Sequence, residues 1–239
     1  MTMNERESRS DMPLPLTEQA FHRLRQEVLT GALVAGKKLK VEELQRRYGF
    51  SSSPLREALS RLAQEGLVRA DQRRGFRVAP ISIDDLADIT RLRVLIDPQA
   101  LEDALLHGDD EWEARVVASF HRLEKIERRL PPGPLQLDAD WSRLHREFHL
   151  TILSACTSER LRDWSASLFD QAERYRHVSA AFRTTPRYKS DDHRRLLEAV
   201  MQRDAETARN LWVEHVLHTD RNVREALRTR FEHLGVTDH

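Results

Sequence analysis

The chain has 239 residues, 39 of them basic and 39 acidic, so its formal net charge is zero. Charged residues make up 33% and only 8 residues are glycine, which favours helices with polar outer faces over sheets. The polar N-terminus is no secretory signal, no apolar run reaches the roughly 18–20 residues of a membrane span, and the lone Cys156 excludes an internal disulfide. We expect a soluble, mainly helical protein of the cytoplasm.

The charges are divided unevenly along the chain. Residues 1–15 hold two basic and three acidic side chains, and we expect them to form a disordered arm. Residues 16–80 hold 13 basic and 7 acidic side chains, whereas residues 81–239 hold 24 basic and 29 acidic. This division predicts a basic segment that binds a polyanion, joined to a larger domain with another task. The alternative is chance clustering of charges on solvated faces.

The basic segment begins with two predicted helices. Thr17 is the expected N-cap of the first, whose apolar residues recur at helical spacing until Gly31. The second fits Val41–Tyr48, with Gly49 as its C-terminal stop.

A third helix is predicted to start with Ser53 as N-cap and Pro54 at the first helical position, and to end near Gly66. One of its sides is apolar and the other polar, as in the recognition helix of a helix-turn-helix that enters a major groove. The apolar side consists of Leu55, Ala58, Leu59 and Leu62, and the polar side of Ser53, Arg56, Glu57, Ser60 and Gln64.

Two short strands are predicted after this helix, at Leu67–Ala70 and Gly75–Val78. Arg73, Arg74 and Arg77 would lie on this hairpin, where basic side chains suit phosphate or minor-groove contacts. The alternative is an ordinary hairpin with charged residues for solubility. Three helices and a basic hairpin together predict a winged helix-turn-helix that binds DNA.

Three motifs in this segment resemble the winged helix of GntR-type bacterial regulators. They are Pro54–Leu59 (PLREAL), Glu65–Val68 (EGLV) and Arg74–Val78 (RGFRV). The resemblance implies that Ser53 and Arg56 contact the operator, a double-stranded DNA site, and that the wing approaches the minor groove. The family often has arginine where Ser52 stands, which implies a different operator. The expected DNA-binding residues are Arg46, Ser52, Ser53, Arg56, Arg73, Arg74 and Gly75.

From residue 83 onward the pattern predicts helices at about 83–106, 109–129, 138–156, 159–178, 188–202 and 204–228. Asp109 is the expected N-cap of the second. Six antiparallel helices can bury one sizeable core, so we expect an all-α bundle over residues 81–232.

Four histidines of this bundle are candidates for a metal site. His145 and His149 are one helical turn apart and share a face, so their imidazoles can bind one ion. Glutamate does not follow the first histidine directly, so this is not the zincin motif. His193 and His215 lie on the last two predicted helices. The alternative is that each is an ordinary core or surface histidine.

The bundle resembles the FCD ligand-binding domain of the FadR-type branch of the GntR family. Many FCD domains hold a divalent metal with an aspartate or asparagine and three histidines. The resemblance places His145, His149, His193 and His215 on those four positions, with His145 replacing the acid or amide. Four imidazoles suit Zn²⁺ or Ni²⁺ but leave the ion's charge uncompensated, which favours an anionic ligand. The alternatives are a weak site or histidines that bind the effector directly.

Arginines of the bundle are candidates for binding that effector. Arg93 matches the arginine that FCD domains point into the cavity to pair with a carboxylate; the alternative is a surface pair with Asp97. Arg176 and Tyr175, with Arg174, are further candidates, although we expect that one helix cannot turn all three inward. Several stretches are also similar to carbon-starvation regulators that repress glutarate and γ-aminobutyrate catabolism, which implies a short dicarboxylate or hydroxyacid.

These features together predict a homodimeric, ligand-responsive regulator, most simply a repressor, that binds a pseudo-palindromic operator and is not an enzyme. One alternative is a metal-dependent hydrolase fused to a DNA-binding segment, with water activated at the histidines. Another is a constitutive DNA-binding protein with a purely structural bundle.

Overall fold

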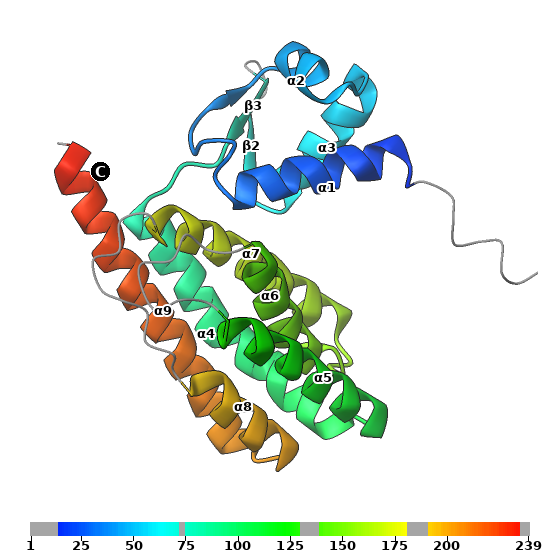
Figure 1. Cartoon of the computed structure of the whole chain (residues 1–239), viewed down its shortest axis with the longest axis vertical. Coiled ribbons are helices and arrows are strands. Elements are labelled where there is room, and N and C mark those ends of the chain that lie inside the picture. The colour runs from blue at the N-terminus through cyan, green and yellow to red at the C-terminus, as the bar shows by residue number, and fades with distance from the viewer. Residues whose placement is uncertain (1–13, 72–74, 130–138, 181–190, 235–239) are drawn as a thin grey trace, which may run out of the picture. The chain divides into compact units, whose positions relative to one another are not determined.

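The computed structural model describes residues 14–71, 75–129, 139–180 and 191–234 (Figure 1). The chain divides into two compact units. The first extends to Ala79, and the second begins at Pro80 and includes the short segment Leu29–Gly31. The described residues are mainly helical with one small sheet, which confirms the predicted fold class.

The first unit contains three helices and a three-stranded antiparallel sheet. The strands lie in the order β1-β3-β2, and Arg77 of β3 pairs with Lys38 on one side and Arg69 on the other. The elements are α1 (Leu16–Leu29), β1 (Lys38–Leu39), α2 (Val41–Tyr48), α3 (Ser52–Gln64), β2 (Val68–Asp71) and β3 (Gly75–Val78).

Two predicted helix starts in this unit are wrong by two residues. The first helical hydrogen bond of α1 runs from Gln19 N–H to the Pro15 carbonyl oxygen (3.0 Å), so Thr17 lies inside the helix. Ser51 has the extended backbone of an N-cap (φ −70°), which places Ser53 and Pro54 within α3. Three consecutive serines have the same capping propensity, so sequence alone could not choose among them.

Apolar side chains and ion pairs fix the first-unit helices to one another. Leu55, Leu59 and Leu62 of α3 are fully buried. Arg61 binds Glu18 at 2.5 Å and Glu65 binds Arg25 at 3.1 Å, so two ion pairs join α3 to α1. The buried apolar side of α3 leaves its polar side exposed.

The second unit is a bundle of six helices within the described residues. Helix α4 lies against α6, α7 and α9, while α5 packs on α6 and α8. None of these helices, nor any in the first unit, is both long and apolar enough to cross a membrane over the described residues. The helices are α4 (Ile83–His107), α5 (Asp110–Glu127), α6 (Ala139–Leu153), α7 (Glu159–Ala180), α8 (Asp192–Met201) and α9 (Ala205–Leu234).

Tryptophans anchor the bundle core at several helix junctions. Trp112 of α5 and Trp212 of α9 are buried. The Trp112 indole N–H reaches the Thr151 carbonyl oxygen on α6 at 3.0 Å. As predicted, Asp109 caps α5, because its carboxylate accepts the Trp112 backbone N–H at 2.7 Å. Trp112 and Trp212 thus belong to one apolar core that includes side chains of α5, α6 and α9.

Candidate functional site

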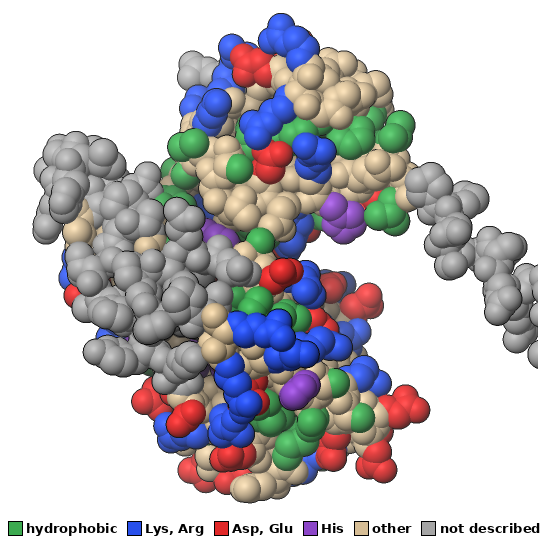
Figure 2. Space-filling view, viewed as in Figure 1, with side chains coloured by type: hydrophobic (Ala, Val, Ile, Leu, Met, Phe, Trp, Pro, Cys, Tyr) green, Lys and Arg blue, Asp and Glu red, His purple; other side chains and the backbone are tan. Residues whose placement is uncertain are grey.

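The polar side of α3 is exposed, as a groove-binding helix requires. Ser52, Ser53 and Arg56 are all exposed, and so is Arg46 on α2. Lys and Arg side chains are visible over the face of the first unit in Figure 2. These four residues are available to DNA in the first unit taken by itself.

The wing is described only in part. Gly75 is exposed and has φ +87°, a conformation that glycine adopts readily. Arg73 and Arg74 lie outside the described residues. Arg77 donates to the Gly36 carbonyl oxygen at 2.6 Å, so this arginine helps to hold the sheet.

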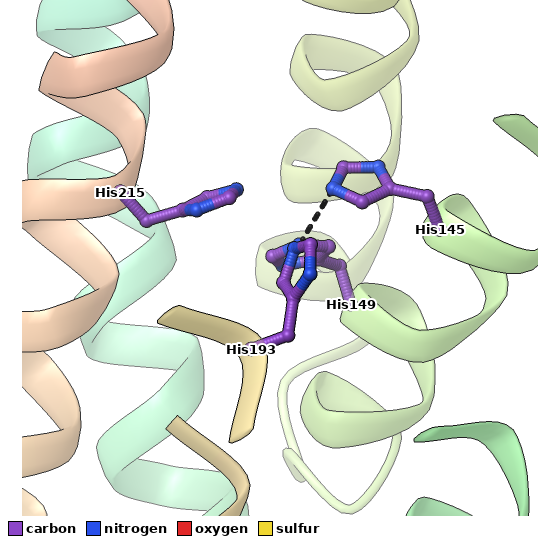
Figure 3. Close-up of side chains that lie close together, drawn as sticks. All are labelled: His145, His149, His193 and His215. Atoms are coloured by element: carbon purple, nitrogen blue, oxygen red, sulfur yellow. Dashed lines mark hydrogen bonds between the residues drawn. The ribbon is translucent and has the colours of Figure 1, made fainter. Parts of the chain in front are cut away.

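The four predicted histidines come together in the second unit, with their rings pointing toward one centre (Figure 3). His145 and His149 come from α6, His193 from α8 and His215 from α9. One ring nitrogen of each lies within 4.8 Å of the others. The first three are buried and His215 is half-buried.

The spacing of the ring nitrogens fits a shared metal ion. His149 Nε2 lies 3.1 Å from His145 Nε2 and 3.4 Å from His193 Nε2. A ring nitrogen carries either one hydrogen or one lone pair, so hydrogen bonding satisfies only one of these contacts. Two nitrogens about 2.0–2.1 Å from a tetrahedral Zn²⁺ ion lie about 3.3 Å apart, close to both distances. These two distances and the all-imidazole donor set are therefore suited to a shared divalent ion.

The surroundings of His145 and His149 favour the neutral imidazole, which is the form that binds metals. Burial lowers the pKa of His145 well below the usual histidine value, and the Arg176 guanidinium lowers it further. Burial also lowers the pKa of His149, with added effects from the other histidines and from Arg93 and Arg176. Trp141 stacks on His145 at 4.5 Å between ring centroids, and Phe169 lies 5.5 Å from it. The cluster thus has aromatic walls.

Two guanidinium groups flank the cluster. Arg176 Nη2 lies 2.9 Å from His145 Nδ1, and the same side chain binds Glu173. The guanidinium carbons of Arg93 and Arg176 lie 5.2 and 5.6 Å from the centre of the Phe169 ring. Cations beside neutral imidazoles favour an anion.

Arg93 does pair with Asp97, but the pair is buried rather than on the surface. Arg93 Nε lies 3.1 Å from Asp97 Oδ2, and the two residues are 6% and 1% exposed. The predicted pairing of Arg93 with Asp97 is therefore present but its predicted surface location is wrong, and effector binding by Arg93 stays a prediction.

Arg174, Tyr175 and Arg176 of α7 have three different surroundings. All three are buried, because α7 packs against α4, α6 and α9 and so has several covered sides. Only Arg176 reaches the histidines in the described contacts. The Tyr175 hydroxyl donates to Asp85, and Arg174 donates to the Pro80 carbonyl oxygen at 2.7 Å.

Two residues of the site carried no sequence signal. Phe169 lies beside both guanidinium groups, and Glu127 Oε1 lies 3.5 Å from His193 Nδ1 while accepting the Trp141 indole N–H at 3.1 Å. A carboxylate on the second ring nitrogen orients a ligating histidine and raises its basicity. Glu127 also supplies negative charge near the cluster, where His145 replaces the family's acid or amide.

Comparisons with known proteins agree with this organisation. Residues 16–78 match the bacterial regulatory proteins of the gntR family, and residues 88–218 match the FCD domain. The chain is 38% identical to the uncharacterized HTH-type transcriptional regulator BphR of Paraburkholderia xenovorans, over 84% of this chain and 82% of that protein. It is 36% identical to the HTH-type transcriptional repressor GlaR of Escherichia coli, over 81% of this chain and 89% of that protein. The solved structure of E. coli McbR/YncC shares the fold, with a TM-score of 0.74 and 21% identity. The match covers 89% of this chain and 99% of that one.

Proposed function

This chain belongs to the GntR family of bacterial transcriptional regulators, with an FCD domain after its DNA-binding domain. From that premise we propose that it is a metal-dependent carboxylate sensor that represses transcription. We assign operator binding to residues 16–80 and ligand binding to residues 81–232. The observation that carries the sensing proposal is the cluster of four histidines, three of them buried, beside Arg93 and Arg176. A homodimer with a pseudo-palindromic operator is part of the same proposal.

Each group at the cluster has a task in binding the effector. His145, His149, His193 and His215 would hold Zn²⁺ or Ni²⁺, which when bound supplies a Lewis-acid anchor for a carboxylate. The Arg93 and Arg176 guanidinium groups offer paired N–H donors to an acidic group. Phe169 and Trp141 exclude water, which strengthens these interactions.

The hydrolase alternative finds little support at the cluster. Glu147 faces Arg122 and Arg143 at the surface, and Glu214 is exposed. Glu127 is held by Trp141 and lies behind His193, on its Nδ1 side. None of these carboxylates contacts the shared centre of the histidines, where a general base would have to reach a bound water. The chain's relatives are DNA-binding regulators rather than enzymes.

Thermal unfolding of chelator-treated protein tests the sensing proposal. We expect Zn²⁺ or Ni²⁺ to stabilise the protein, and one of a panel of short carboxylates to stabilise it further only when metal is present. A ligand at about 100 times its Kd adds roughly 2.7 kcal/mol to the free energy of unfolding. His149→Gln should abolish both shifts, whereas His121→Gln, which changes an exposed histidine of the same bundle, should retain them. A carboxylate shift without metal would contradict the metal anchor.

Arg56→Ala tests the assigned groove contact. A base-reading arginine contributes about 1–3 kcal/mol, so we expect operator affinity to fall about 5- to 150-fold with thermal stability unchanged. Arg23→Ala removes the same charge from an exposed position on α1 and should cost less than about threefold. Fluorescence anisotropy measures the operator affinity of both variants. The duplex is one that the wild-type protein selects from a random library. Equal losses in the two variants would show that Arg56 acts only through its charge.

A further inference from the structure

Two adjacent residues of the connecting segment are anchored in different units. The Ala79 backbone N–H donates to the Leu67 carbonyl oxygen at 3.1 Å in the first unit. The Pro80 carbonyl oxygen accepts from Arg174 Nη2 at 2.7 Å in the second. One peptide bond joins Ala79 to Pro80, so the last anchor in the first unit and the first anchor in the second belong to adjacent residues.

Helix α7 also holds the residues that follow Pro80. The Ser82 backbone N–H donates to the Tyr175 hydroxyl oxygen at 3.4 Å, and that hydroxyl donates to Asp85. Ile81 packs on the apolar cluster that contains Tyr175. Ser82 is in turn the N-cap of α4, accepting the Asp85 backbone N–H at 3.0 Å. Arg174 and Tyr175 therefore fix the whole start of the second unit.

The next residue of α7 belongs to the histidine site. Arg176 contacts His145 and binds Glu173, and its guanidinium lies 5.4 Å from the centre of the Trp141 ring. Arg174, Tyr175 and Arg176 lie on one helical turn, and all three are at most 8% exposed. Close-packed side chains on one helical turn transmit strain to one another. A ligand that displaces Arg176 therefore acts on the same helical turn that holds Pro80 and Ser82.

We propose that this turn of α7 couples the histidine site to the DNA-binding unit, with Arg174 and Tyr175 as positioning residues that pass the ligand signal to segment 80–85. The inference rests on the proposed function, because it needs a ligand at the cluster. It assigns the two residues a role in the response to that ligand and none in holding it.

The test compares ligand response with ligand binding in the full-length chain. The probe is Zn²⁺, alone and with each of acetate, lactate and succinate, and the DNA is the duplex selected by the wild-type protein. The variants are Arg174→Gln, which removes the donor to Pro80, and Tyr175→Phe, which removes only a hydroxyl group. The matched control is Arg203→Gln, because Arg203 likewise donates to backbone carbonyl oxygens, those of Leu105 and Gly108 at 2.6 and 2.9 Å.

In the wild type and in Arg203→Gln, we expect the best probe to change duplex affinity by about 5- to 150-fold, the usual range of coupling between sites. In Arg174→Gln and Tyr175→Phe, the change should fall below about twofold while zinc affinity stays within about threefold of wild type. A full response in both variants overturns the coupling role and leaves the sensor intact. A wild-type protein that binds zinc but shows no response to any probe overturns the regulatory proposal itself.

Hydrogen exchange supplies a second readout that needs no DNA. Zinc should change the exchange rates of amides 81–86 in the wild type, and this change should disappear in Tyr175→Phe. Unchanged exchange at these amides in zinc-loaded wild-type protein would overturn the route through α7.

Discussion

Lowering the pH of the chelator-treated protein from about 7.5 to about 5.5 is expected to reduce its free energy of unfolding by about 4 kcal/mol. Three histidines with lowered pKa values cause this effect. Burial lowers the pKa of His145 and His149 well below the usual value, and burial together with Arg176 lowers the pKa of His177 to about 4. In the unfolded chain the same groups titrate near pH 6.5.

The sign follows from proton binding. Between the folded and unfolded pKa values the unfolded chain binds more protons, so acid favours unfolding and stability rises with pH. Over these two pH units each histidine contributes about 1.4 kcal/mol, since one unit of pKa difference corresponds to about that energy. Carboxyl groups with ordinary pKa values are still ionised at the lower pH and contribute little.

Urea unfolding followed by circular dichroism at several pH values measures the effect. His177→Gln removes one of the three groups and should reduce the loss by about one third. His121→Gln, at an exposed position, should leave the loss unchanged. A stability that is flat or rises as the pH falls through this range would show that these imidazoles are not held neutral in the folded protein.

Local signals in the sequence predicted most helices of the fold well. The bounds of α2 were correct at both ends, because Gly49 adopts the left-handed conformation (φ +75°) that stops a helix. Apolar periodicity placed the helices of the second unit within about four residues at each end, except that α9 continues to Leu234, beyond the predicted end at about residue 228. Strand β1 was missed, since two residues carry no periodicity and Lys38–Leu39 is a strand only because β3 pairs with it.

The candidate site depended more on tertiary contacts than on local pattern. The helical spacing of His145 and His149 predicts their shared face, but no local rule brings His193 and His215 to the same centre. Resemblance to a family supplied that step. The burial of Asp97 beside Arg93 and the inward turn of Arg174 follow from how α4 and α7 are covered by neighbouring helices. A periodic pattern does not show how many sides of a helix are covered.

Replacing Asp97 by alanine is expected to destabilise the protein by about 3–5 kcal/mol, the usual cost of removing one partner from a buried ion pair. Asp97 Oδ2 accepts from Arg93 Nε and from the Trp212 indole N–H, each at 3.1 Å. Its removal leaves the Arg93 charge and the Trp212 donor buried without this partner. Asp88→Ala is the matched control, because Asp88 pairs with Arg91 on the exposed face of the same helix and should cost at most about 1 kcal/mol.

A double variant separates the stability of this pair from its use at the site. Arg93→Leu combined with Asp97→Leu replaces both charges by apolar groups, so the remaining cost should be about 1–3 kcal/mol, that of the Trp212 N–H left without its acceptor. The metal-dependent shift with a carboxylate should remain weakened, because the Arg93 guanidinium beside Phe169 is gone. Thermal unfolding without ligands measures the stability of the double variant. The same measurement with zinc and succinate gives its metal-dependent carboxylate shift. Full carboxylate response in a stable double variant would restrict Arg93 to a structural role and leave Arg176 as the arginine that binds the effector.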